Sequence, residues 1–151
     1  MIKSKEIAVT IRFMVARALL LDAWRRNGGS IEPYKNLIDS LLDLVAIGTV
    51  ADIMPLNVTL NRSLVRRGLE VLNQAQRPGI QALMEVASVQ AGQASAMSIG
   101  FGLGPRINAA GRLDSALAAY ELLSAKNMID ARRYAEQLQS LNSKRQTLTR
   151  E

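Results

Sequence analysis

Two stretches of the sequence hold the residues whose types and spacing could support chemistry. Residues 41–56 (LLDLVAIGTVADIMPL) form the most apolar run of the chain, and a carboxylate, Asp52, lies near its end. Residues 100–114 (GFGLGPRINAAGRLD) combine glycines with Arg106, Asn108 and Arg112. A buried carboxylate requires a hydrogen bond, a cationic partner or a metal ion. Arginines beside accessible backbone N–H groups can bind a phosphate.

The environment expected for Asp52 follows from reading residues 35–54 as one helix. Advancing about 100° per residue places Asp52 on the apolar stripe of that helix, whereas Asp39 and Asp43 face solvent. This position favours a functional carboxylate. Three structural alternatives stay open: the helix ends before Asp52, Asp52 caps the turn at Pro55, or it pairs with an arginine.

The glycine-rich stretch is expected to interrupt a helix at residues 102–105 (GLGP), because proline cannot continue the hydrogen-bond ladder and glycine frees the backbone. Asp114 or Ser115 would then cap the next helix. The resulting helix N-terminus, with Arg106 and Arg112 beside it, would make an anion cradle. The Gly-Pro pair by itself also fits an ordinary turn.

The composition limits the class of protein. Hydrophobic residues make up 48% of the 151 residues, and aromatic residues only 4%, so we expect an aliphatic core. Alanine and leucine are abundant, which predicts a mainly α protein with about six or seven helices. There is no histidine and no cysteine. This chain alone therefore cannot form a Ser-His-Asp triad, a histidine- or thiolate-ligated metal site, or a disulfide.

The charge and hydropathy suggest a partner and a location. A net charge of +6 suits an anionic partner such as nucleic acid, but it also fits an ordinary basic surface. Charged residues or glycine interrupt each apolar run before the roughly 20 residues that a membrane span requires. We see no signal peptide, and we expect a cytoplasmic protein without a membrane partner.

Further helices are expected on both sides of the two stretches. Residues 7–24 carry one apolar stripe, and two glycines stop this helix. Other helices are expected at 57–74, 80–87 and 127–151, the last being long enough to lean on a partner. In the helix at 57–74, Arg62 and Arg66 form either a solvent face paired with Glu70 or, less plausibly, a phosphate-binding row.

Four blocks together resemble the RecJ family of single-strand-specific 5′→3′ exonucleases, within the DHH phosphoesterase superfamily. The blocks are residues 41–56, NRSLVRRGLEVLN (61–73), RPGIQALMEVA (77–87) and IGFGLGPRINAAGRLD (99–114). The resemblance implies hydrolysis of single-stranded DNA in repair and recombination, with two Mn²⁺ or Mg²⁺ ions held by Asp and His residues of four motifs. It places Asp52, in GTVAD, at the metal-binding aspartate of the fourth motif. It makes Arg106, Asn108 and Arg112 candidates for phosphate contacts.

The chain departs from the family because it has no histidine, and the first three motifs would lie before Met1. We therefore expect an internal piece, with residues 1–125 forming the helical part of a catalytic domain and 126–151 a connector helix. One carboxylate cannot hold two metal ions, so we assign no catalytic residue and expect the chain alone to bind no metal and to be inactive.

Two other hypotheses compete with an inactive exonuclease piece. The chain could be a non-catalytic helical module that binds nucleic acid through its arginines, or that binds a protein partner or a second copy of itself through exposed apolar helix faces. Alternatively, a separate polypeptide could supply the missing motifs.

Overall fold

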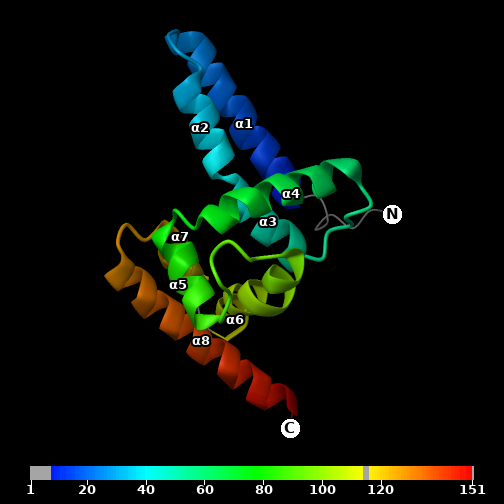
Figure 1. Cartoon of the computed structure of the whole chain (residues 1–151), viewed down its shortest axis with the longest axis vertical. Coiled ribbons are helices and arrows are strands. Elements are labelled where there is room, and N and C mark those ends of the chain that lie inside the picture. Colours follow the sequence, from blue (N-terminus) through cyan, green and yellow to red (C-terminus); the bar gives the residue numbers. More distant parts are fainter. Residues whose placement is uncertain (1–7, 114–115, 151) are drawn as a thin grey trace. The chain divides into compact units, whose positions relative to one another are not determined.

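A computed structural model of the chain describes residues 8–113 and 116–150 (Figure 1). Every regular element in these ranges is a helix, which confirms the mainly α expectation. No helix among these residues is long and apolar enough to cross a membrane. The chain divides after Val71 into two compact units. The separate roles expected for residues 1–125 and 126–151 stay a prediction.

The first unit is built from α1 (Ala8–Asn27), α2 (Glu32–Ser40), α3 (Leu42–Ala51) and most of α4 (Thr59–Gln74). Its core is aliphatic apart from one phenylalanine, and each of the four helices contributes to it. The buried members are Phe13, Ile38, Leu42, Val45 and Leu64. The predicted stop of the first helix is confirmed, because Gly28 and Gly29 follow it with φ of 69° and 80°.

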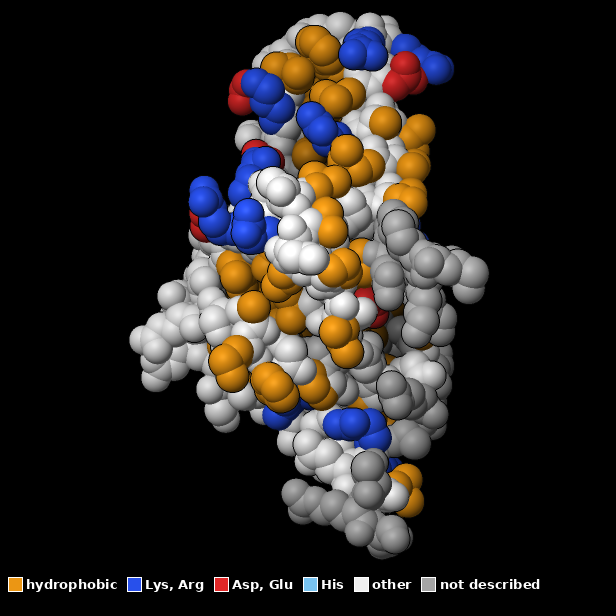
Figure 2. All heavy atoms as spheres, turned by 90° about the vertical axis from the view of Figure 1, so that its right-hand side faces the viewer, with side chains coloured by type: hydrophobic (Ala, Val, Ile, Leu, Met, Phe, Trp, Pro, Cys, Tyr) orange, Lys and Arg blue, Asp and Glu red, His pale blue; other side chains and the backbone are white. Residues whose placement is uncertain are grey.

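The apolar stripe expected on the first helix is largely exposed. Ile11, Met14 and Val15, three members of that stripe, are 52%, 39% and 52% exposed. The core is instead contacted from another side of α1, where Phe13 is 8% exposed. Figure 2 shows hydrophobic side chains gathered over the part of the surface that α1 forms. Helix α1 is thus apolar on two sides, as helices buried between two layers usually are.

The single helix expected at residues 35–54 is wrong, because the chain forms two helices, α2 and α3, that are separated at Leu41. Leu41 has φ −86° and ψ −9°, and it lies between the two helices. The Ser40 hydroxyl donates a hydrogen bond to the Leu37 carbonyl at 2.8 Å. A serine hydroxyl that bonds to the preceding turn competes with the helical ladder and commonly bends it.

Helix α4 approaches α3 closely at Gly68. A Cβ atom at this position would lie 2.2 Å from the Leu42 carbonyl oxygen and 2.6 Å from the Ala46 Cβ. Leu42 and Ala46 are both buried, so neither can move aside. A glycine is therefore required where the two helices touch.

The second unit contains α5 (Pro78–Val86), a π-helix η1 (Ser98–Leu103), α6 (Gly104–Leu113), α7 (Leu117–Ser124) and α8 (Met128–Arg150). Helix α8 packs against α5, α6 and α7. Small residues let these helices approach closely, and Ala109, Ala110, Ala131 and Ala135 are fully buried.

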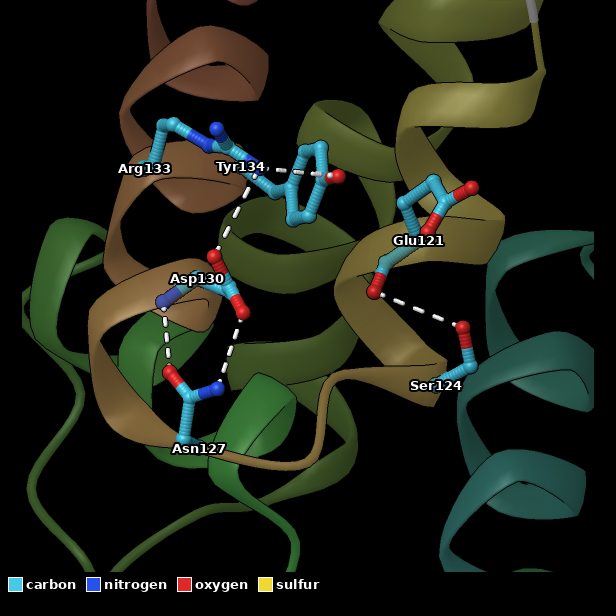
Figure 3. Close-up of polar contacts among 6 residues, drawn as sticks. All are labelled: Glu121, Ser124, Asn127, Asp130, Arg133 and Tyr134. Atoms are coloured by element: carbon cyan, nitrogen blue, oxygen red, sulfur yellow. Dashed lines mark hydrogen bonds and ion pairs between the residues drawn. The ribbon is translucent and has the colours of Figure 1, made fainter.

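The start of α8 is fixed by a reciprocal capping arrangement (Figure 3). The Asp130 backbone N–H donates to the Asn127 side-chain oxygen at 2.9 Å, and the Asn127 amide donates to the Asp130 carboxylate at 2.8 Å. The Asp130 carboxylate also lies 3.5 Å from the Arg133 guanidinium. The Asn127 side chain thus satisfies one of the backbone donors that a helix N-terminus leaves open.

Candidate functional site

Asp52 is the last residue before the chain turns away from α3. It is the C-terminal capping residue of that helix, with φ −87° and ψ 7°, and its N–H donates to the Gly48 carbonyl at 3.0 Å. Its side chain is exposed. Of the three structural alternatives, the helix ending before Asp52 is therefore the one observed. Among the described residues, the Asp52 carboxylate has no recorded hydrogen bond or ion pair.

The helical wheel assigned the two acids of α3 to the wrong environments. Asp43, expected to face solvent, is only 5% exposed, whereas Asp52, expected on the buried stripe, is exposed. One Asp43 carboxylate oxygen accepts the Leu44 backbone N–H at 2.6 Å. The error has two physical causes. Helix α3 is buried on most of its sides, so Asp43 is covered although it lies off the expected stripe, and Asp52 lies beyond the end of the helix. Asp39 is exposed as expected and pairs with Arg67 at 2.9 Å.

In the described part of the chain, Asp52 has too few potential metal ligands beside it to form a site for a divalent cation. Within the described ranges, no group of three or more His, Cys, Asp or Glu side chains could bind a metal ion. Divalent cations such as Mg²⁺ and Mn²⁺ need several oxygen or nitrogen ligands. Asp52 is therefore not part of a multi-ligand cation site within the described residues.

The glycine-rich stretch does not interrupt the helix, which corrects the expected break at residues 102–105. The chain runs without a loop from η1 into α6, and the Gly104 N–H donates five residues back to the Ile99 carbonyl. Pro105 has no N–H and would clash with the carbonyl four residues earlier in a regular α-helix. The wider π-turn accommodates it. The Gly104 N–H is thus bonded inside the helix and is not open to an anion.

Arg106 is bound to the protein itself through all of its guanidinium nitrogens. Its Nη1 donates to the Gly102 carbonyl at 2.7 Å, Nη2 to the Val86 carbonyl at 3.1 Å, and Nε to the Gln139 side chain at 2.7 Å. Partial burial lowers the pKa of Arg106 from its usual value by desolvation. These contacts tie α5, η1 and α8 to α6. The sequence does not reveal this structural role, because two of the acceptors are backbone carbonyls and the third, Gln139, is distant in sequence.

The other two candidates in this stretch are placed differently. Asn108 is exposed on α6, and a Cβ at neighbouring Gly111 would meet nothing within 4 Å. The backbone of Arg112 belongs to α6, whereas its side chain and the expected caps Asp114 and Ser115 lie outside what the structure describes.

The arginines on α4 form the paired solvent face favoured by their spacing. Arg66 lies 3.9 Å from Glu70, and Arg67 is bonded to Asp39. Arg62 is exposed and has no recorded ion pair within the described residues. Exposed pairs of this kind contribute little to stability.

Comparisons with known proteins agree with these features, although no family model matches the chain. The chain is 45% identical over 137 residues to the single-stranded-DNA-specific exonuclease RecJ of Dickeya dadantii, covering 89% of this chain and 23% of that protein. It is 37% identical over 145 residues to the RecJ of Bacillus subtilis, covering 95% of this chain and 16% of that protein. The chain thus spans about a quarter or less of the length of these relatives.

Comparison of the fold with solved structures also finds RecJ proteins. The crystal structure of RecJ from Thermus thermophilus in complex with Mn²⁺ matches 73% of this chain and 16% of its own, with a TM-score of 0.66 and 36% identity. A second structure, of that RecJ with Mg²⁺, matches 73% of this chain and 17% of its own, with the same TM-score and identity. The helical arrangement is therefore that of a segment of a RecJ nuclease. By sequence and by fold, the chain belongs to the RecJ family.

Proposed function

We propose that this chain is the part of a cytoplasmic RecJ-type exonuclease that supplies Asp52 to a metal centre. The reaction would be the Mn²⁺- or Mg²⁺-dependent hydrolysis of phosphodiester bonds in single-stranded DNA, from the 5′ end, during DNA repair and recombination. In such a reaction, paired metal ions activate water and stabilise the charge that develops at phosphorus.

The position of Asp52 is the observation that carries the proposal. Its carboxylate is exposed at the end of a buried helix, and no side chain in the described part of the chain is bonded to it. The matched relatives include a RecJ structure with Mn²⁺ and one with Mg²⁺. Asp52 lies in the block GTVAD, one of those on which the resemblance rests.

We further propose that the chain has no nuclease activity by itself. The sequence contains no histidine, and Asp52 belongs to no cluster of potential metal ligands in the described ranges. One carboxylate binds a divalent cation weakly and cannot position two. We therefore expect the remaining ligands to come from the rest of a RecJ-type protein or from a second polypeptide.

The phosphate contacts are proposed for Asn108 and Arg112, with Arg106 in a supporting position. Asn108 is accessible on α6, whereas the Arg106 guanidinium is already engaged by three acceptors. Binding of a phosphate by Arg106 would require it to give up at least one of these bonds. Arg106 is thus the least available of the three residues.

Nuclease assays on two forms of the protein test this function. The 151-residue chain, mixed with Mn²⁺ and 5′-labelled single-stranded DNA, should release no nucleotides. A chimera in which residues 8–150 replace the matching segment of the Thermus thermophilus RecJ should be active, and Asp52→Asn should abolish its activity. Asp39→Asn is the matched control, because Asp39 is an exposed acid of the same unit. Full activity of the Asp52→Asn chimera would refute the metal-ligand role.

A second candidate function, a non-catalytic binding module, is favoured by the exposed apolar side of α1. Three large side chains, Ile11, Val15 and Leu19, are more than half exposed there, and such patches commonly mark protein interfaces. This module would bind a protein partner or a second copy of the chain, or nucleic acid through its basic surface.

Light scattering and binding titrations distinguish these versions. Self-association that Val15→Glu abolishes would support the second copy. Affinity for single-stranded DNA that falls steeply with salt concentration would support the nucleic-acid version. A monomer that binds no DNA would exclude both.

A further inference from the structure

The residue immediately after Asp52 has an unusual backbone conformation. Ile53 has a φ of 55°, in the left-handed region that β-branched residues rarely adopt. Two hydrogen bonds hold it there: the Ile53 N–H donates to the Val50 carbonyl at 3.0 Å, and the Met54 N–H donates to the Thr49 carbonyl at 3.0 Å. This is a Schellman motif, in which the left-handed position is most often glycine.

The side chain of Ile53 makes little packing contact within the described chain that could offset this backbone strain. It is 88% exposed, the largest value among the exposed large hydrophobic residues. Leu56, Val58 and Leu60, which follow along the chain, are also 37%, 47% and 45% exposed. An isoleucine that is both strained and exposed is disfavoured on two counts compared with glycine.

Ser88 provides an internal comparison. It follows α5 with the same φ of 55°, and its N–H and that of Val89 donate to the Glu85 and Met84 carbonyls at 3.1 and 3.0 Å. Both helices therefore end in the same motif with the same dihedral angle. Serine is neither β-branched nor apolar, so the unexplained feature of the Asp52 corner is the isoleucine side chain.

We propose that Ile53 is a positioning residue for Asp52. Its side chain packs into an apolar socket on the part of a RecJ-type protein that carries the other metal ligands, and this contact fixes the left-handed turn that directs the Asp52 carboxylate. The inference rests on the proposed metal-ligand role of Asp52. It explains why a branched apolar side chain stands where glycine would relieve the backbone.

The first test uses thermal unfolding of the 151-residue chain. Ile53→Gly should raise the midpoint by about 1–4 °C, because it relieves the left-handed strain while losing little packing. Ser88→Gly should also raise the midpoint, by a smaller amount. A lower midpoint for Ile53→Gly would mean that the side chain already stabilises this chain by itself, and this would overturn the proposal.

The second test uses the chimera described above and measures the Mn²⁺ concentration that gives half-maximal exonuclease activity. Ile53→Gly should raise this concentration about 10- to 100-fold, as the loss of groups that orient metal ligands does. Ile53→Val, which keeps a branched apolar side chain, should restore most of the Mn²⁺ affinity. Ser88→Gly is the matched control and should leave the Mn²⁺ dependence unchanged.

The outcomes separate this inference from the function on which it rests. If Asp52→Asn abolishes activity but Ile53→Gly leaves the Mn²⁺ dependence unchanged, only the positioning role is wrong. If the Asp52→Asn chimera stays active, the metal-ligand role fails, and the positioning of Asp52 has no function to serve.

Discussion

The contact of α4 with α3 at Gly68 gives a prediction whose sign depends on the tertiary structure. In an isolated helix, Gly→Ala stabilises by about 1 kcal/mol, because alanine loses less conformational freedom. At Gly68, however, the added Cβ would lie 2.2 Å from the Leu42 carbonyl oxygen and 2.6 Å from the Ala46 Cβ. Relieving this overlap requires the helices to separate by roughly 1 Å, since carbon atoms pack at about 3.5–4.0 Å.

The expected magnitude follows from these two opposing terms. Overpacking of a buried contact costs about 1–3 kcal/mol, and the upper end applies here because the Leu42 oxygen is a backbone atom that cannot rotate away. After the helix-propensity gain, Gly68→Ala should destabilise the protein by about 2 kcal/mol. At about 2–4 °C per kcal/mol, the thermal midpoint should fall by about 4–8 °C.

Gly111→Ala is the matched control, because Gly111 also lies within a helix but its Cβ would meet nothing within 4 Å. It should raise the midpoint by about 2–4 °C. Thermal unfolding followed by circular dichroism measures both variants under the same conditions. Equal effects of the two substitutions, or a stabilised Gly68→Ala protein, would refute the close helix contact.

Three further predictions concern the second unit. Arg106→Ala should destabilise the protein by about 2–4 kcal/mol in urea unfolding, because it leaves the acceptors of three hydrogen bonds unpaired; an effect below about 0.5 kcal/mol, as expected for an ordinary surface substitution, would contradict the structural role. The hydrogen bonds from Arg132 at 3.0 and 3.2 Å lower the pKa of Glu85 from its usual 4.5. The ionised Glu85 is thus favoured in the folded state, and its contribution to stability is complete above pH 4.5 and lost as the pH falls through the lowered pKa. The free energy of unfolding should therefore differ only slightly between the wild type and Glu85→Gln, since the Glu85 and Arg132 side chains are both about half exposed. This difference should disappear in acid. A difference that grows as the pH falls would contradict the lowered pKa. Asn127→Ala should cost about 1 kcal/mol and speed amide hydrogen exchange at the start of α8, whereas unchanged exchange there would exclude the cap.

Several features of the fold could be read from local chemistry. Aliphatic residues at helical spacing, with glycines after α1 and proline in the first turns of α2 and α5, were sufficient to predict a mainly α protein and the approximate ends of most helices. The four blocks that include Asp52 and Arg106 were sufficient to predict the RecJ resemblance, which the 45% and 37% identities to two RecJ proteins confirm. The pairing of Arg66 with Glu70 also followed from local spacing alone.

Other features depend on contacts between residues distant in sequence or on small changes of backbone geometry. Helix α3 is buried on most of its sides and ends before Asp52, so Asp43 is covered and Asp52 is exposed, the reverse of what a helical wheel indicates. A hydrophobic pattern can show that α1 is apolar, but only the packing of Phe13 shows which side the core uses. The π-turn that carries the chain through Pro105, and the acceptors that Val86 and Gln139 offer to Arg106, exist only once α5, α6 and α8 are assembled. The sequence alone therefore singled out Asp52 and Arg106 as candidate site residues. Only the folded chain shows that the Asp52 side chain is exposed and that the Arg106 guanidinium is already hydrogen-bonded.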